Sequence, residues 1–163
     1  MRACRTVSPS SSTSAVVAAA ALALTGAVVF QLYGAGSPSP LAWRDLSPRL
    51  RGIELPDPAR RTFKVPAAIR DFQLEAMPGV TPRRVPLDWR REELVLVSPG
   101  PRSSTGYGVR IVSVTERRDR IDVVARETSP RLGDRVEARV TYPYRLLAIP
   151  RSGKRVHIVW EGQ

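Results

Sequence analysis

The chain offers few side chains that could perform catalysis. A serine or cysteine nucleophile needs a base within hydrogen-bond reach, and the one histidine, His157, lies on the polar side of an alternating stretch. Ser103 and Ser104 lie in a glycine-containing loop but lack the Gly-x-Ser-x-Gly sequence of a nucleophile elbow. Glu92 and Glu93 are adjacent, so on a strand their carboxylates point to opposite faces, and we expect both at the surface. These residues predict that the protein is not an enzyme.

The residue types that hold metals and cofactors are scarce as well. A zinc site needs three or four histidine, cysteine or carboxylate ligands, whereas this chain has one histidine and one cysteine, Cys4. It contains no glycine-rich phosphate-binding motif. The sequence therefore predicts no metal ion, no cofactor and no disulfide.

Two segments rich in tyrosine, proline and hydroxyl groups are the candidates for a binding site. The first is a loop made of Ser103, Ser104, Thr105, Gly106 and Tyr107. It is either a wide turn whose Tyr107 packs into the core or a loop that binds a protein partner. The second is the corner Tyr142-Pro143-Tyr144. It is either a bulge where proline interrupts strand pairing or a secondary binding site.

Short strands must position these segments. From residue 94 onward hydrophobicity repeats with a period of two, as in strands with one buried face. Turn residues separate six such stretches, at 94–97, 107–115, 120–127, 135–142, 144–149 and 155–161. They predict an all-β fold, a small antiparallel sandwich or barrel whose consecutive strands mostly pair as hairpins. We expect the core to contain Val136, Ala138, Val140, Val156, Ile158 and Trp160. The largely apolar stretch 144–149 is expected to be buried on both faces.

The N-terminal region has the pattern of a membrane-targeted chain. Residues 1–14 are rich in serine and threonine, and residues 15–33 are apolar, rich in alanine and free of charge. This length fits either a transmembrane anchor or a cleaved signal segment. Arg2 and Arg5 precede it, which places the N-terminus in the cytoplasm and the rest outside. We expect a single-pass protein of the cell membrane with an extracytoplasmic C-terminal domain, or a secreted protein if the segment is cleaved.

Residues 34–85 contain most of the prolines of the chain. Proline removes backbone donors and disfavours long regular elements, which predicts a linker. Residues 61–65 and 69–77 are expected as short elements that pack through Phe63, Phe72 and Leu74. The folded domain is therefore expected at 86–163, with residues 37–60 outside it.

The chain is strongly basic, with a formal net charge of +11 from 24 arginines and 2 lysines against 15 acidic residues. Acidic residues are interleaved through the C-terminal half, so we expect no specific binding of nucleic acid. Two interpretations remain, a solvated basic surface or attraction to anionic lipid headgroups and wall polymers.

Motifs that recur in order from residue 86 to 160 resemble the C-terminal domain of the PrcB family. They are Asp88-Trp89-Arg90-Arg91-Glu92 before the first strand, the Ser104-Thr105-Gly106-Tyr107 loop, and Thr141-Tyr142-Pro143-Tyr144. Thr105 stands where the family pattern has glycine. The family is named for a subunit of a secreted protease complex. The resemblance implies an exported, non-catalytic domain that stabilises or accompanies a protease.

The same loop is similar, over one short motif, to the Thr-Thr-Gly-Tyr loop of chagasin-like inhibitors of cysteine proteases. The leading expectation is therefore an extracytoplasmic domain that binds another protein, a protease or a different envelope component. The first alternative is a protease inhibitor that acts through residues 103–107. The second is a basic module that adheres to anionic envelope polymers.

Overall fold

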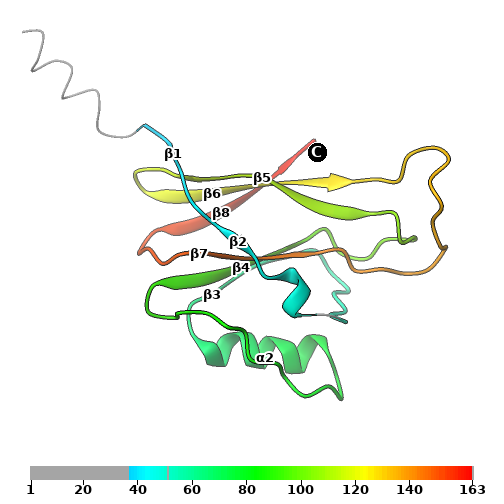
Figure 1. Cartoon of the computed structure of the whole chain (residues 1–163), viewed down its shortest axis with the longest axis horizontal. Helices are drawn as coiled ribbons and strands as arrows, with labels where there is room; N and C mark the ends of the chain where they lie inside the picture. The colour runs from blue at the N-terminus through cyan, green and yellow to red at the C-terminus, as the bar shows by residue number, and fades with distance from the viewer. Residues whose placement is uncertain (1–36, 51, 163) are drawn as a thin grey trace, which may run out of the picture. The chain divides into compact units, whose positions relative to one another are not determined.

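Two four-stranded sheets form the frame of the computed structural model, which describes residues 37–50 and 52–162 (Figure 1). The outer sheet has the order β1 (Ser39–Pro40), β5 (Gly108–Glu116), β6 (Arg120–Thr128) and β8 (Arg155–Glu161). The central sheet has the order β2 (Arg44–Asp45), β7 (Arg145–Pro150), β4 (Glu92–Ser98) and β3 (Ala59–Phe63). The fold is mostly β, as the sequence predicts, and the two sheets do not close into a barrel.

The central sheet is buried on both faces. Along β4, Val95 and Val97 point into the core that lies between the two sheets, whereas Leu94 and Leu96 pack into a second core on the opposite face. In β7 the side chains alternate between the same two cores. Because successive strand residues face opposite sides, a strand covered on both sides reads as a continuous apolar run. The expected two-sided burial of residues 144–149 is confirmed.

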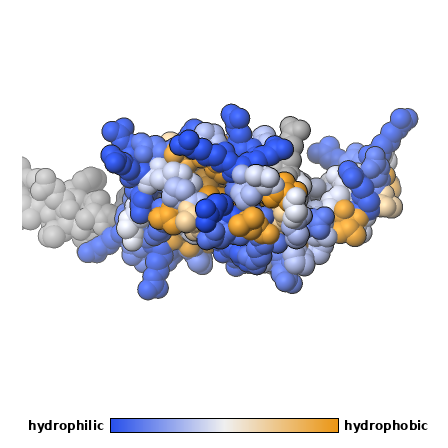
Figure 2. Space-filling model, turned by 90° about the horizontal axis from the view of Figure 1, so that it is seen from below, coloured by the Kyte–Doolittle hydropathy of each residue, from blue (hydrophilic) through white to orange (hydrophobic). Residues whose placement is uncertain are grey.

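A helical layer covers the outer side of the central sheet. It contains the 3₁₀ turn η1 (Ser47–Arg49) and the helix α2 (Pro66–Ala76), which begins with proline in its first turn. In α2, Ile69, Phe72 and Ala76 recur at the spacing of one helix face and are buried. The rings of Phe63 and Phe72 lie 5.3 Å apart between their centroids. Seen from this side, hydrophilic side chains cover most of the surface and apolar ones appear in separate spots (Figure 2).

The expectation of a linker at 34–85 is wrong over the described part of that range. Residues 38–85 supply β1, β2, β3, η1 and α2, and they contribute a large share of the second core. Proline misled the prediction because Pro40 lies in an edge strand and Pro48 and Pro66 lie in first helical turns, where no backbone donor is lost. Phe63 and Phe72 pack as expected, whereas Leu74 is exposed.

The expected strand at 135–142 is also wrong. Apart from an isolated bridge between Thr141 and Arg102, this stretch pairs with no strand among the described residues. Val136 is 42% exposed, Val140 is 62% exposed, and Ala138 is exposed as well. The following strand β7 already pairs with β2 on one side and β4 on the other, so the stretch before it cannot form a hairpin with β7.

The pairing pattern differs from a simple run of hairpins. The other five expected strands are present, and among these five only β5 and β6 are both consecutive and paired. β8 lies parallel to β6, so the sandwich is not purely antiparallel. In β8 the predicted face is confirmed, since Ile158 is buried and Val156 and Trp160 pack against the core between the sheets.

The expected membrane segment at 15–33 lies outside the described residues, and so does the N-terminal stretch 1–14. Within the part of the chain that the structure describes, no helix combines the length and the hydropathy that crossing a bilayer requires.

Glu93 is the unexpected member of the core. Its side chain is fully buried, and neither carboxylate oxygen has a hydrogen-bond partner within normal geometry. Its nearest cation is Lys64, whose Nζ lies 3.8 Å from Oε2. Burial raises the pKa of Glu93, and the charge of Lys64, the backbone amide of Ser152 and the charge of Arg151 only partly oppose the shift. The expectation that this carboxylate lies at the surface is wrong, whereas Glu92 does lie near the surface and pairs with Arg44.

Replacing Leu50 tests whether the upstream segment belongs to the cooperative unit. Leu50 is fully buried, so Leu50→Ala is expected to lower the free energy of unfolding by about 2–5 kcal/mol, the usual cost of such a cavity. The matched control is Leu74→Ala, which removes the same atoms from a side chain that is 53% exposed. Denaturant titration should separate the two variants, and equal small losses would mean that residues 38–85 fold apart from the sandwich.

The buried carboxylate predicts a pH-dependent stability. Because the pKa of Glu93 in the fold exceeds the ordinary value of about 4.5, ionised Glu93 destabilises the fold at neutral pH. Acidification through the raised pKa protonates it and removes that cost. Glu93→Gln should therefore stabilise the protein most near neutral pH, and its advantage over the wild type should shrink towards about pH 5.

The measurement is the free energy of unfolding by denaturant titration at the two pH values. Glu54→Gln is the control, because Glu54 is exposed and surface substitutions change stability by only about 0.5 kcal/mol or less. A Glu93→Gln advantage that stays constant or grows on acidification would contradict the assignment of a buried, destabilising carboxylate.

Candidate functional site

Both candidate segments lie in loops at the same end of the sandwich. Residues 99–107 connect β4 to β5, and residues 129–144 connect β6 to β7 (Figure 1). The two loops are joined by backbone hydrogen bonds in both directions between Arg102 and Thr141, each 2.8 Å long. The structure thus brings together two segments that the sequence separates by more than thirty residues.

Further bonds attach the 103–107 loop to its neighbour. The amide of Thr105 donates to the carbonyl of Glu137 at 3.1 Å, and the amide of Glu137 donates to Thr105 Oγ1 at 3.0 Å. Thr141 Oγ1 donates to the carbonyl of Ser104 at 2.7 Å. Ser103 is exposed, and Ser104 is half-buried. The hydroxyl groups of Thr105 and Thr141 therefore hold the two loops together.

Gly106 is required by the close approach of the loops. A Cβ atom at this position would lie 2.6 Å from Pro130 Cβ and 2.6 Å from Val136 Cγ1. Carbon atoms do not approach so closely without displacing the backbone, so any larger residue would separate the loops. The glycine in the Ser-Thr-Gly-Tyr motif serves packing between the loops.

Arg102 anchors the base of the loop pair. Its guanidinium makes a bidentate ion pair with Glu127 of β6, with 2.7 Å between Nη2 and Oε2, and it also donates to the carbonyls of Pro99 and Pro101. The hydrogen bonds to Glu127 raise the pKa of Arg102 further above its ordinary value. A two-pronged contact of this kind fixes both distance and orientation.

The Tyr142-Pro143-Tyr144 corner is attached to the central sheet. Ser98 Oγ at the end of β4 donates to the carbonyl of Pro143 at 2.8 Å and accepts the amide of Gly100 at 3.1 Å. The hydroxyl of Tyr144 donates to the carbonyl of Ser47 in η1 at 3.1 Å. The corner is thus bonded to both the central sheet and the upstream segment.

These contacts create one shallow groove, here called the tyrosine groove, with a volume of about 490 Å³. It is lined by Ser47, Pro48, Tyr107, Gly108, Val109, Tyr142, Pro143, Tyr144 and Arg145. The tyrosine of the first candidate segment and the whole of the second therefore share one surface. Tyr107 is half-buried in this groove and belongs to neither hydrophobic core, which differs from the interpretation as a turn whose tyrosine packs into the core.

Sequence reasoning missed the contribution of η1 to the groove. Ser47 and Pro48 come from a segment expected to be a linker. Ser47 is buried, and its Oγ accepts the amide of Leu146 at 2.9 Å, which fixes η1 against β7. The sequence carries only a weak signal for this placement, the apolar spacing of Leu46 and Leu50 around a proline.

His157 lies on a different element from the candidate serines. It is exposed on β8, and its Nδ1 lies 3.4 Å from Oδ1 of Asp122 on the neighbouring strand. Burial alone would raise the pKa of Asp122, but the guanidinium groups of Arg117 and Arg120 outweigh it and hold that pKa below its usual range. Among the described residues, no group of His, Cys, Asp and Glu side chains could hold a metal ion.

Comparison with known proteins identifies a family match. Residues 94–150 match the family described as PrcB C-terminal, a range that begins in β4 and ends with β7. It contains both candidate loops and the three tyrosines of the groove. No curated protein matches the chain, and no solved structure matches it. Nothing in these comparisons supports the similarity to chagasin-like inhibitors.

The resemblance drawn from the Ser-Thr-Gly-Tyr loop and the Thr-Tyr-Pro-Tyr corner is therefore confirmed in this range, where residues 94–150 match the PrcB C-terminal family.

Proposed function

We propose that the protein is a non-catalytic binding module whose tyrosine groove holds an extended segment of a protein partner. The observation that carries this proposal is the convergence of Tyr107, Tyr142 and Tyr144 with two prolines on one groove. The groove is shallow and is built from loops that are bonded to each other and to the sheet. Such a surface suits contact with another chain more than enclosure of a small molecule.

The chemistry of the groove favours an extended peptide. Tyrosine offers a large contact area at a low cost in side-chain entropy, together with a hydroxyl that can form hydrogen bonds. Grooves lined with aromatic residues are a recurrent way to bind extended, proline-containing segments. Arg145 at the groove, already close to Asp45 at 3.7 Å, adds a donor for a backbone carbonyl or a carboxylate of the partner.

The family suggests the kind of partner. PrcB is named for a subunit of a secreted protease complex, so we propose that the partner is a protease or another protein of the cell envelope. The role is then accessory, to stabilise or accompany the partner outside the cytoplasm. Residues 15–33 would anchor the chain in the membrane or direct its export, and this part of the proposal rests on the sequence alone.

The groove supports partner binding better than the tip of the 103–107 loop does. An inhibitor loop needs groups that are free to enter the active site of the protease, but the Thr105 hydroxyl and the Ser104 carbonyl already serve contacts between the loops. Only Ser103 at the tip is both exposed and without such a bond to the neighbouring loop. We therefore place the binding surface at the groove and assign the loop a supporting role.

Site-specific photocrosslinking in the native host tests this assignment. A photoreactive phenylalanine analogue at Tyr142 should give a discrete protein adduct, because this half-buried side chain lines the groove. The same analogue at Val112, which is 44% exposed on the outer sheet, should not give that adduct. Mass spectrometry of the adduct then identifies the partner.

A second substitution links the adduct to the groove. Tyr107→Ser in the Tyr142-labelled chain should reduce the adduct strongly, whereas Val112→Ser should leave it unchanged. Thermal melting of each variant shows whether the fold survives. An adduct that persists in a folded Tyr107→Ser variant, or that forms equally from Val112, would contradict binding at the tyrosine groove.

A further inference from the structure

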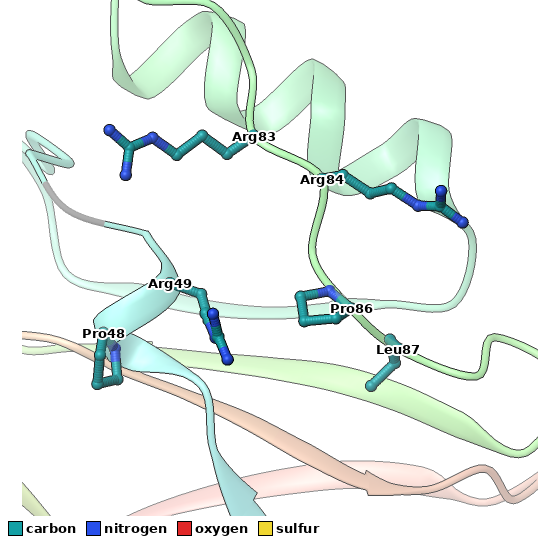
Figure 3. A pocket seen from close by; sticks show the side chains of 6 residues that line it. All are labelled: Pro48, Arg49, Arg83, Arg84, Pro86 and Leu87. Carbon is teal, nitrogen blue, oxygen red and sulfur yellow. The ribbon is translucent and has the colours of Figure 1, made fainter.

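A second hollow, here called the arginine hollow, lies beside the helical layer. It has a volume of about 640 Å³ and is lined by Pro48, Arg49, Arg83, Arg84, Pro86 and Leu87 (Figure 3). Arg49 comes from η1, and the other basic residues come from the segment between α2 and β4. The prolines and the leucine supply an apolar surface between the charged groups.

The charges of this hollow are unbalanced. None of its lining residues is acidic, and within the described ranges Arg49, Arg83 and Arg84 take part in no ion pair. Elsewhere arginines are commonly paired, as in Arg102 with Glu127 and Arg126 with Glu161. Three guanidinium groups without a carboxylate repel each other, and an anionic ligand would remove that repulsion.

A buried glutamine fixes the backbone that carries two of these arginines. The side chain of Gln73 in α2 is almost fully buried, and its Nε2 donates to the carbonyl of Arg83 at 3.0 Å. The amide of Arg83 in turn donates to Gln73 Oε1 at 2.7 Å. Val85, two residues later, is buried in the core. The backbone of the exposed Arg83 and Arg84 is therefore fixed by the bonds to Gln73 on one side and by the buried Val85 on the other.

The arginine side chains are spread along the hollow. Figure 3 shows Arg83 and Arg84 pointing in opposite directions from their segment, with Arg49 on the facing side. A further hollow of about 360 Å³ shares Arg83 and Arg84 with the arginine hollow and is also lined by Arg70. None of its lining residues is acidic. The positive charge thus follows a path across the surface and does not converge on one point.

We propose that the arginine hollow binds a linear polyanion, a flexible chain that carries phosphate groups at intervals. Guanidinium forks match the oxygens of phosphate with two parallel hydrogen bonds. Separated arginines suit successive groups of one chain, whereas a single phosphate could satisfy only one of them. A hollow with basic residues on facing sides admits a chain between them, which a flat bilayer surface cannot enter.

This site is separate from the tyrosine groove in its chemistry and residues, except that Pro48 borders both. The protein would then hold a partner protein at one surface and a phosphate-bearing polymer at another. The sequence-based expectation of attraction to anionic polymers gains a defined location in these arginines.

Binding of short-chain inorganic polyphosphate by the full-length chain in non-ionic detergent tests the proposal. Isothermal titration should show polyphosphate binding that weakens steeply with salt and greatly exceeds binding of orthophosphate. Arg49→Gln and Arg84→Gln should each weaken binding about fivefold, since one arginine near an anionic surface contributes about that factor. Each should also lower the slope of log affinity against log salt by about one.

The controls remove the same charge elsewhere. Arg110→Gln and Arg155→Gln alter exposed residues of the outer sheet that have no ion pair in the described part of the chain. They should leave polyphosphate affinity within about twofold of the wild type. Equal losses in all four variants would reduce the effect to net charge and overturn the site.

Two further outcomes would also overturn the proposal. Vesicles of anionic lipid that bind more tightly than polyphosphate, with the same dependence on Arg49 and Arg84, would assign the arginines to a membrane surface. Orthophosphate that competes at concentrations similar to those of polyphosphate would reduce the hollow to a site for single anions. Circular dichroism of each variant confirms that the fold is retained, because all four side chains are exposed.

Discussion

The burial of the central sheet on both faces is the constraint on which the rest of the structure depends. One face needs the outer sheet and the other needs the helical layer, and residues 38–85 supply most of that layer together with both edge strands. Continuous apolar strands such as β4 and β7 cannot face water on either side without a large loss of hydrophobic stabilisation. The tyrosine groove follows from the same requirement, because η1 reaches the Tyr144 corner only while it covers the central sheet.

The sequence predicts the strands themselves better than their partners. Period-two alternation located β5, β6 and β8, and an unbroken apolar run correctly indicated the two-sided burial of β7. Alternation fails at 135–142 because it records which side chains could share a face and says nothing of whether a neighbouring strand is available. Proline density fails at 38–85 because its effect depends on position, being harmless in first helical turns and edge strands. Glu93 shows the same limit, since a charged residue near the start of a strand does not reveal which layer covers it.

The candidate site was predictable in its residues but not in its assembly. Glycine, proline and tyrosine marked residues 103–107 and 142–144 as unusual, and the fold places both at one end. The Thr105 hydroxyl and the Ser104 carbonyl of the first loop, however, bond to the second loop, and only the tyrosine of the first loop reaches the groove. The place of Ser47 in the groove and the arginine hollow were not predicted, because the segments that form them are distant in the sequence and come together only in the fold. Runs such as Arg83-Arg84 are common on basic surfaces, and only the absence of acidic neighbours in the fold distinguishes this one.

The pairing of β2 with β7 has a consequence for the order in which the chain folds. Arg44 lies opposite Ala148, so the first strand of the central sheet finds its place only after nearly the whole chain has been synthesised. Contacts over such long separations are slow to form, since loop-closure entropy must be overcome first. Until then Leu46 and Leu50 remain exposed to solvent or to other chains, and a chaperone or a transport apparatus that delays premature contacts would raise the yield of folded protein. Strand β2 is thus made early but can pair only after β7 has been made.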